Sequence, residues 1–425
     1  MSQGSSDFLL HPDLPGAGAG YSIMDLGDAE QLVAMVTPRG RGTFGEQARE
    51  AMSVVQTALH KRPRAMTALA QTVFLRDPGD QAECERILAA RYGAEPPVTS
   101  FVLQPPCSGA ALATEVWAIG GDGVRVERFD PLAGPPAGSQ ALAVSYGGLR
   151  WVYCAGAASA PAAEAYGQTL SVLEQMRSAL EKAGGRFERV VRTWFYLGGI
   201  NEPEEAGNQR YEQLNRARSD FYSGIRFYPS LLPPFFPRQE AAHGRVYPSS
   251  TGIGMAGGGL AAGCLAFEAE RAGTFLLPLE NPLQTPAYDY QCGCSSRSPE
   301  FSRAMALFCG NSVITWISGT ASIVLSESRH PDDVEKQTEQ TIGNIERLIS
   351  RENFALHGVD GAGARLRDLA AVRVYVKRPE DFERCRAVCE RRLHGAPVIY
   401  TVADVCRPEL LVEIEAVAFS RRLPV

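Results

Sequence analysis

The sequence predicts an α+β protein made of three similar units, each a mixed sheet with two helices on one face. Three observations predict it. The order helix, strand, helix, strand recurs three times along the chain. The helical segments are amphipathic, and the strand segments are rich in β-branched residues. The 425 residues also suffice for two or three domains of ordinary size.

One such unit leaves a sheet face uncovered, so we expect the three units to bury these faces against each other as an intramolecular pseudo-trimer. The first unit is expected over 26–122, after a flexible N-terminus over 1–25. The middle unit is expected over 140–275 and the last over 290–425. Loop-like stretches rich in Pro and Gly separate the units.

The elements follow in the same order in each unit. In the first, apolar spacing predicts helices around 48–59 and 84–88, and strands around 72–75 and 113–118. The interval between Gln47 and Glu115 resembles that between Gln337 and Glu413 in the last unit, so we expect these pairs to be equivalent.

The middle unit repeats the pattern, with helices predicted over 166–180 and 211–221 around a strand over 190–197. In the last unit the helices fall at 334–349 and 381–393, and the strands at 371–376 and 410–418.

An insertion rich in Pro and aromatic residues over 224–248 interrupts the middle unit. Loops of this length are uncommon in compact domains and are often lids or binding loops. A surface excursion packed on the body by its own aromatic residues is an equally good interpretation.

The composition argues against several classes of function. The chain has 42 Lys and Arg against 48 Asp and Glu, a net charge of −6, which argues against a nucleic-acid partner. No apolar run reaches the roughly 18 residues of a membrane span. The first twenty residues lack the basic and apolar regions of a signal peptide. We therefore expect a cytoplasmic protein with no membrane association.

Ten cysteines are scattered along the chain, and reduced, mostly buried thiols are their expected state. Cys292 with Cys294 and Cys385 with Cys389 are the candidate halves of a zinc site. Neither has a paired C-x-x-C or a His at a recurring spacing, so no metal is expected.

Short motifs resemble known families. Gln337-Thr338-x-Gln340-Thr341 with Asn344-Ile345, and the terminal Leu411-Val412-Glu413-Ile414-Glu415-Ala416, resemble the Rid/YjgF family, whose best-known members are trimeric imine deaminases. Residues 110–425 resemble more closely the chorismatase family, which acts on chorismate and is built from Rid-like units. The resemblance implies that the last unit is catalytic and that the first is structural.

Several stretches carry the second resemblance in order. They are Arg192-Thr193-Trp194-x-Tyr196, Gly199-Ile200-Asn201, Thr251-Gly252-Ile253-Gly254, Glu280-Asn281-Pro282, Tyr290, Arg297, Phe301-Ser302-Arg303-Ala304, Ile317-Ser318-Gly319-Thr320 and Cys406-Arg407-x-x-Leu410-Leu411-Val412-Glu413.

Chorismate carries two carboxylates, and guanidinium groups bind carboxylates bidentately. The resemblance makes Arg303, Arg297 and Arg192 candidates for this role, with Tyr290 and Tyr196 beside the substrate. For each arginine alone, a solvated surface ion pair is the alternative.

The resemblance implies that Glu413 is the catalytic acid. Cleavage of the enol ether needs a proton on the methylene carbon, and a carboxylic acid supplies it if burial raises its pKa. Glu415 lies two residues on and shares the same face, so like-charge repulsion would act in the same direction. Exposure of both carboxylates on a sheet edge is the alternative.

Gly319 and Cys406 stand where family members differ by product, and Gly with Cys resembles the branch that forms 3-hydroxybenzoate and pyruvate. Hydrolysis of chorismate to a dihydroxycyclohexadiene carboxylate is the alternative product. No cofactor is expected, and chorismate is the expected partner of a monomeric chain, although further association stays open.

Two other functions remain as alternatives. A Rid-type enamine or imine deaminase grips its substrate with an arginine, but none occurs over 395–406, 97–100 or 247–268, where the three units would carry it. A non-catalytic ligand-binding protein on the same frame would leave Tyr290, Arg303 and Glu413 without a role.

Overall fold

The structure is a computed structural model of the chain. It describes residues 18–130, 139–161, 163–204, 207–228, 230–237, 245–290 and 298–423.

The first unit is a five-stranded sheet with two helices. Its strands are β1 (Gly18–Asp25), β2 (Glu30–Thr37), β3 (Thr67–Leu75), β4 (Val98–Leu103) and β5 (Leu112–Gly120). Its helices are α1 (Phe44–His60) and α2 (Gln81–Tyr92). The strands lie in the order β1-β2-β5-β3-β4, with only β3 and β4 paired parallel.

The middle unit contains a six-stranded sheet. Its strands are β6 (Arg125–Phe129), β7 (Gln140–Tyr146), β8 (Leu149–Ser159), β9 (Val190–Gly198), β10 (Ser249–Met255) and β11 (Leu260–Ala269). The helices are α3 (Ala165–Lys182) and α4 (Arg210–Tyr222). The order is β10-β9-β11-β8-β7-β6, and β9 pairs parallel with β10.

The last unit is also six-stranded, in the order β12-β13-β14-β19-β17-β18. Its strands are β12 (Thr274–Leu279), β13 (Ala304–Cys309), β14 (Ser312–Ala321), β17 (Leu369–Val376), β18 (Val398–Val402) and β19 (Val412–Arg421). Its helices are α6 (Val334–Ile349), α7 (Arg351–Leu356) and α8 (Phe382–Arg392). A small ribbon of β15 (Ile323–Val324) and β16 (Glu327–Ser328) stands apart.

The three sheets share one topology. In each, the strand that comes last in the unit (β5, β11 or β19) inserts between the strand before the first helix and the strand after it. This confirms the predicted α+β fold of three repeated units.

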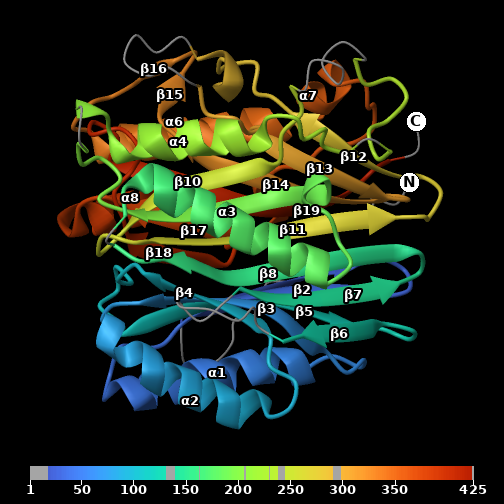
Figure 1. The fold of residues 1–425 in the computed structure, drawn as a ribbon, viewed down its shortest axis with the longest axis horizontal. Coiled ribbons are helices and arrows are strands. Elements are labelled where there is room, and N and C mark those ends of the chain that lie inside the picture. Colours follow the sequence, from blue (N-terminus) through green and yellow to red (C-terminus); the bar gives the residue numbers. More distant parts are fainter. Residues whose placement is uncertain are drawn as a thin grey trace.

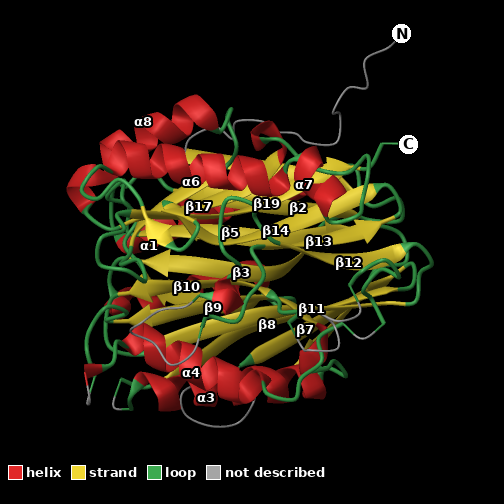
Figure 2. Ribbon diagram, turned by 90° about the horizontal axis from the view of Figure 1, so that it is seen from above, coloured by secondary structure: helices red, strands yellow, loops and turns green. Residues whose placement is uncertain are grey.

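The sheets pack face to face around a pseudo-threefold axis, and the helices lie outside (Figures 1 and 2). β4 of the first unit packs on β8 of the middle unit, β10 packs on β14 of the last, and β18 packs on β2 of the first. Each unit therefore presents the same edge to the next, and the ring closes within one chain.

Apolar side chains fill the space between the sheets. The rings of Trp151 on β8 and Trp316 on β14 meet edge to face at 5.9 Å, and those of Trp117 on β5 and Phe419 on β19 at 6.3 Å. Separate apolar clusters lie between helices and sheet in the first and last units. The uncovered sheet face that one unit leaves is thus buried by the other two.

Local chemistry sets where the helices begin. Thr43 accepts from the backbone N–H of Glu46, and the Glu46 carboxylate accepts from the backbone N–H of Thr43, a capping box that starts α1. The Asp333 carboxylate accepts from the N–H of Lys336 at the start of α6. One face of α6, which includes Ile342, Ile345 and Ile349, is buried as its periodicity predicts.

Three strands lie outside the predicted unit boundaries. β1 covers 18–25, which the sequence assigned to a flexible N-terminus. β6 lies wholly, and β12 for the most part, in the intervals between the predicted units, and both form sheet edges. β6 gives no clear apolar pattern, because it is only five residues long and has no fully buried position.

The predicted equivalence of Glu115 and Glu413 is wrong by two residues. The Gln47 carboxamide accepts from the N–H of Ala111, and that of Gln337 accepts from the N–H of Leu411, both at 2.8 Å. This shared contact aligns Glu115 with Glu415 instead, and it aligns Ala113 with Glu413.

The described part of the 224–248 insertion packs on the body. Phe227, Tyr228 and Leu231 are buried there, and Phe227 contacts Tyr247. Residues 238–244 lie outside the described residues. None of the described residues of the insertion lines the main pocket.

The described cysteines are all free thiols, and Cys385 and Cys389 are buried on the inner face of α8. Cys292 and Cys294 lie outside the described residues. No helix in the described ranges has the length and apolarity that a bilayer crossing requires.

We predict that Trp316→Ala lowers the free energy of unfolding by about 3–5 kcal/mol, because it opens a cavity where the sheets meet. Urea denaturation of the full chain measures it. The control Leu356→Ala removes a side chain that is 69% exposed, and its effect should stay within about 0.5 kcal/mol. Equal effects of both variants would contradict a core shared between units.

Candidate active site

A pocket of about 420 Å³ opens at the seam between the middle and last units. The middle unit contributes α4 and β10, through Gln209, Tyr211, Glu212, Asn215, Arg218, Ser250 and Gly252. The last unit contributes Tyr290, Ser298, Pro299, Phe301, Arg303, Gly319, Ala321, Ile323, Cys406, Arg407, Pro408, Glu409 and Glu413. Neither unit alone encloses the space.

Glu413 lies in the wall of this pocket. It belongs to β19, which runs between β14 and β17, and its side chain is 4% exposed. No hydrogen bond reaches its carboxyl from the residues that the structure describes. Burial, and next the charge of Glu415, raise its pKa to about 8, against the opposing charges of Arg192 and Arg303. Glu413 is therefore a neutral acid at pH 7.

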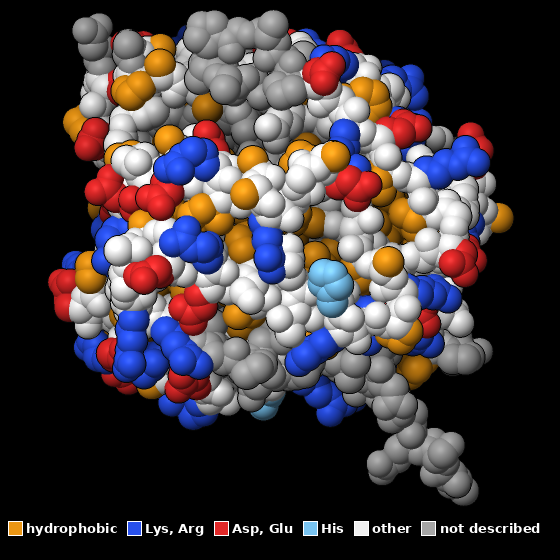
Figure 3. Space-filling model, turned by 90° about the horizontal axis from the view of Figure 1, so that it is seen from below, with side chains coloured by type: hydrophobic (Ala, Val, Ile, Leu, Met, Phe, Trp, Pro, Cys, Tyr) orange, Lys and Arg blue, Asp and Glu red, His pale blue; other side chains and the backbone are white. Residues whose placement is uncertain are grey.

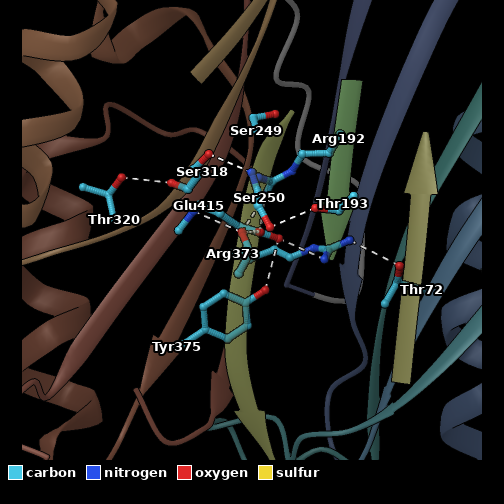
Figure 4. A network of polar contacts seen from close by, with 12 residues as sticks. Thr72, Arg192, Thr193, Ser249, Ser250, Ser318, Thr320, Arg373, Tyr375 and Glu415 are labelled. Atoms are coloured by element: carbon cyan, nitrogen blue, oxygen red, sulfur yellow. Dashed lines mark hydrogen bonds and ion pairs between the residues drawn. The ribbon is translucent and has the colours of Figure 1, made fainter. Parts of the chain in front are cut away.

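Glu415, two residues along β19, has the opposite character. Its carboxylate accepts hydrogen bonds from Arg192, Thr251 and Tyr375 and forms a second ion pair with Arg373 at 2.9 Å (Figure 4). Burial acts against its charge, but the two arginines and the hydroxyl donors outweigh burial and lower its pKa. Two neighbouring carboxyls thus have different protonation states at neutral pH.

The groups that bind Glu415 come from the middle and last units, and one of them, Arg373, also contacts the first unit. Arg192 stands on β9 of the middle unit and Arg373 on β17 of the last. Arg373 also donates through Nε to Glu115 of β5 at 2.8 Å and through Nη2 to Thr72 of β3 at 3.2 Å. We name Glu115, Arg192, Arg373 and Glu415 the charge network.

Gly319 makes room for the acid. A β-bulge in β14 sets Ser318 and Gly319 together opposite Glu415. A Cβ at position 319 would overlap Oε1 of Glu413 and come within 3.2 Å of Cγ2 of Thr251. The Gly319 N–H donates to Oγ1 of Thr251 at 3.0 Å, so the bulge is tied to the middle unit.

Two buried guanidinium groups face the same pocket. Arg303 donates to the Tyr290 hydroxyl and to the carbonyl of Thr285, and Arg218 donates to Oδ1 of Asn215 at 2.7 Å. The Nε atom of each has no hydrogen-bond partner in the described parts of the chain. Both groups lie within 6 Å of the Phe301 ring centre.

These hydrogen bonds of Arg303 and Arg218 reach neutral oxygens, although the two residues are only 3% and 1% exposed. A charge buried without a counter-charge is costly, and a carboxylate ligand would supply both the charge and the missing acceptors. The pocket therefore suits an anion.

Cys406 and Arg407 also line the pocket. Burial, and next Glu413, raise the pKa of the Cys406 thiol to about 12, so the thiol stays protonated and is a poor nucleophile. The Arg407 guanidinium lies 5.5 Å from the Tyr290 ring centre and donates to the carbonyl of Ser326.

The structure brings together five of the predicted site residues in one pocket, namely Glu413, Cys406, Gly319, Arg303 and Tyr290. Arg297 lies outside the described residues. Arg192 and Tyr196 do not line this pocket, so their positions do not support direct contact with a substrate there. Both lie on the face of β9 turned to the centre, where Arg192 binds Glu415 and the Tyr196 hydroxyl accepts from Arg373 at 2.7 Å.

Arg218 is the main site residue that sequence reasoning missed. It lies on the buried face of α4 with Leu214, Ala217 and Phe221. Its helical spacing with these apolar residues is a signal in the sequence. A charged side chain on the buried face of a helix needs a partner, which marks it as a candidate site residue.

The other two seams lack the acid. Strand register aligns Glu413 with Ala113 of β5 and with Ala261 of β11. The rest of the seam is retained in part, since the Gly156 N–H donates to Oγ of Ser100 as Gly319 donates to Thr251.

The raised pKa of Glu413 predicts a pH-dependent stability difference between the wild type and Glu413→Gln. From about pH 4.5 to 8 the unfolded carboxyl ionises while the folded one stays protonated, so the wild type loses about 1.4 kcal/mol per pH unit relative to the variant. Below that window the difference is constant, and above pH 8 it is constant again. Urea denaturation at several pH values measures it, and parallel pH dependences would contradict the neutral acid.

Comparison with known proteins identifies relatives of the chain. It is 34% identical over 272 residues to a 3-hydroxybenzoate synthase of Streptomyces hygroscopicus, a match covering 63% of this chain and 73% of that protein. It is 34% identical over 234 residues to a chorismatase of Streptomyces rapamycinicus, covering 54% of this chain and 64% of that protein, just under two thirds.

A chorismatase crystal structure superposes with a TM-score of 0.60 at 24% identity, covering 83% of this chain and 93% of that one, so the two share a fold. No family model matches the sequence. The extent of the sequence match, together with the shared fold, places this chain in the chorismatase family.

Proposed function

We propose that this protein is an enzyme that converts chorismate to 3-hydroxybenzoate and pyruvate, with Glu413 as the acid. The observation that carries the proposal is the pocket itself, where a buried carboxyl without a hydrogen-bond partner in the described structure lies with two buried guanidinium groups. The named activities of the relatives support the same substrate.

Arg303 and Arg218 are proposed to bind the two carboxylates of chorismate. Both are already desolvated by the fold, so little of the cost of burying the charge remains when the substrate arrives. Phe301 lies within 6 Å of both guanidinium groups, so an apolar ring surface borders the two charges. Such a surface suits the ring of the substrate.

Glu413 is proposed to protonate the methylene carbon of the enolpyruvyl group. The proton leaves a neutral carboxyl, and the positive charge appears on the carbon that bears the ether oxygen. Glu413 becomes a carboxylate beside that cationic centre, which lowers the energy of the charge-separated state. The neighbouring Glu415 is bound by two arginines and stays ionised.

The products follow from the fate of the cationic carbon. Pyruvate and 3-hydroxybenzoate together contain every atom of chorismate. Water adds at the cationic carbon and returns a proton to Glu413, and the bond from that carbon to the ether oxygen breaks, which releases pyruvate and leaves the oxygen on the ring. Loss of the ring hydroxyl and of a ring proton then gives back one water. The dihydroxycyclohexadiene carboxylate needs one added water instead. Gly319 and Cys406 border the acid, and the protonated Cys406 thiol covers one wall of the pocket. We propose that Gly319 and Cys406 favour 3-hydroxybenzoate, the product formed without net uptake of water.

The reaction changes no oxidation state overall, and we expect it to proceed with chorismate alone. Purified protein should release pyruvate and 3-hydroxybenzoate in equal amounts, which chromatography and a pyruvate assay measure. A diol in place of 3-hydroxybenzoate would overturn the product assignment. Deamination of 2-aminoacrylate with chorismate untouched would overturn the function.

Glu413→Gln should lower kcat by about 10²–10⁴-fold, because it removes the proton and keeps the shape. The matched control is Glu346→Gln, whose exposed carboxylate pairs with Arg392 outside the pocket, and it should retain activity within a few-fold. Full activity of Glu413→Gln would exclude it as the acid.

Arg218→Met should lower kcat/KM by roughly 10–100-fold, the loss expected for one charge-assisted hydrogen bond to a substrate carboxylate. Steady-state kinetics with chorismate measures this. Arg216→Met removes a charge from the same helix at a residue that packs on Tyr166, outside the pocket, and serves as the control. Equal kinetics of the two variants would contradict carboxylate binding by Arg218.

A further inference from the structure

The first unit contributes no residue to the pocket in the described structure, yet it is ion-paired to the residues behind it. Glu115 of β5 binds Nε of Arg373 at 2.8 Å, and Nη1 of the same guanidinium lies 2.9 Å from Oε1 of Glu415. A single positive charge is thereby shared between two carboxylates from different units.

The charge network contains two guanidinium groups and two carboxylates, so its formal charges cancel. All four members are at most 6% exposed. Little water screens their charges. A change of charge at one member therefore alters the electrostatic energy of the others more than it would at the surface.

Glu115 is held in place by more than Arg373. Its other oxygen, Oε1, accepts from Nε1 of Trp117 at 2.7 Å. Pseudo-symmetry places Glu115 on β5 where Glu415 stands on β19, whereas the middle unit has Gly263 there. The same carboxylate therefore occurs twice around the axis, and Arg373 lies between the two copies.

We propose that Glu115 is a positioning residue of the active site, which by sharing Arg373 leaves enough uncompensated negative charge on Glu415 to keep Glu413 in its acid form. The inference rests on the proposed function, because it concerns the same acid. It assigns the first unit an electrostatic part in the reaction.

The remaining charged and titratable groups around Glu413 come from each element that packs against it. The last unit supplies Arg303, Tyr290, Cys406, Arg407, Glu409 and Tyr375. The middle unit supplies Arg192, Arg218, Tyr211 and Glu212. Arg192 opposes Glu415 from the other side, so its removal should act in the direction opposite to removal of Glu115.

The direction of each effect follows from the charge balance. Without the charge of Glu115, Arg373 compensates Glu415 more fully, less negative charge remains beside Glu413, and the pKa of Glu413 falls. Without the charge of Arg192, more negative charge remains there, and the pKa of Glu413 rises.

The test compares Glu115→Gln and Arg192→Gln in the full chain. The alkaline limb of the kcat/KM profile with chorismate should move down by roughly half a unit to one unit in Glu115→Gln, and up by a similar amount in Arg192→Gln. Thr72→Val removes a neutral acceptor of Arg373, and Glu30→Gln removes a charge bonded to Arg62 elsewhere in the first unit. Both controls should leave the limb in place.

Loss of rate without movement of the limb in either charge variant would show a structural role alone and overturn the inference. If Glu115→Gln does not fold, Arg192→Gln alone tests the inference, because the same charge balance requires the alkaline limb of its kcat/KM profile to move to higher pH. An unchanged limb there would also overturn the inference.

A second readout separates this inference from the proposed function. The infrared band of a protonated carboxyl, assigned to Glu413 by its absence in Glu413→Gln, can be titrated without substrate. If the wild type converts no chorismate, the function fails, and the band still reports whether Glu115→Gln shifts the titration downward. If chorismate is converted and neither limb nor band moves, the inference alone fails.

Discussion

The binding of Glu415 by Arg192 and Arg373 is the interaction on which the site depends. It joins the middle and last units through a buried ion pair, and Arg373 extends it to Glu115 of the first. A carboxylate with this many donors keeps its charge despite burial, and that fixed charge works with burial to keep its neighbour Glu413 protonated. The same side chains therefore join the units and help to raise the pKa of Glu413.

The pocket divides its work between two units. The last unit holds the acid and Arg303, while α4 of the middle unit brings Arg218 and Asn215 to the opposite wall. The bulge at Gly319 is one contact between these halves, because it clears space for the Glu413 carboxyl and donates to Thr251 across the seam. Small errors in how the two sheets dock would misplace the acid relative to the arginines.

Periodicity and motif order were enough to predict the three-unit fold, because amphipathic helices and β-branched strands are local signals. The gathering of Glu413, Arg303, Tyr290, Gly319 and Cys406 followed from the family resemblance. The helical spacing of Arg218 with Leu214 and Phe221 indicates that it is buried, but its role depends on how α4 docks, which that spacing does not encode. Arg192 was a candidate for substrate binding through the same resemblance, and the sequence does not reveal that its side chain binds Glu415 instead.

The alanines at 113 and 261 have a consequence for how such an enzyme evolves. A homotrimer repeats every substitution at three interfaces at once, so a residue that suits chemistry must also suit packing at each. Covalent fusion removes that coupling. In a fused chain a substitution at one seam leaves the other two unchanged, so a buried carboxyl such as Glu413 destabilises one seam and not three.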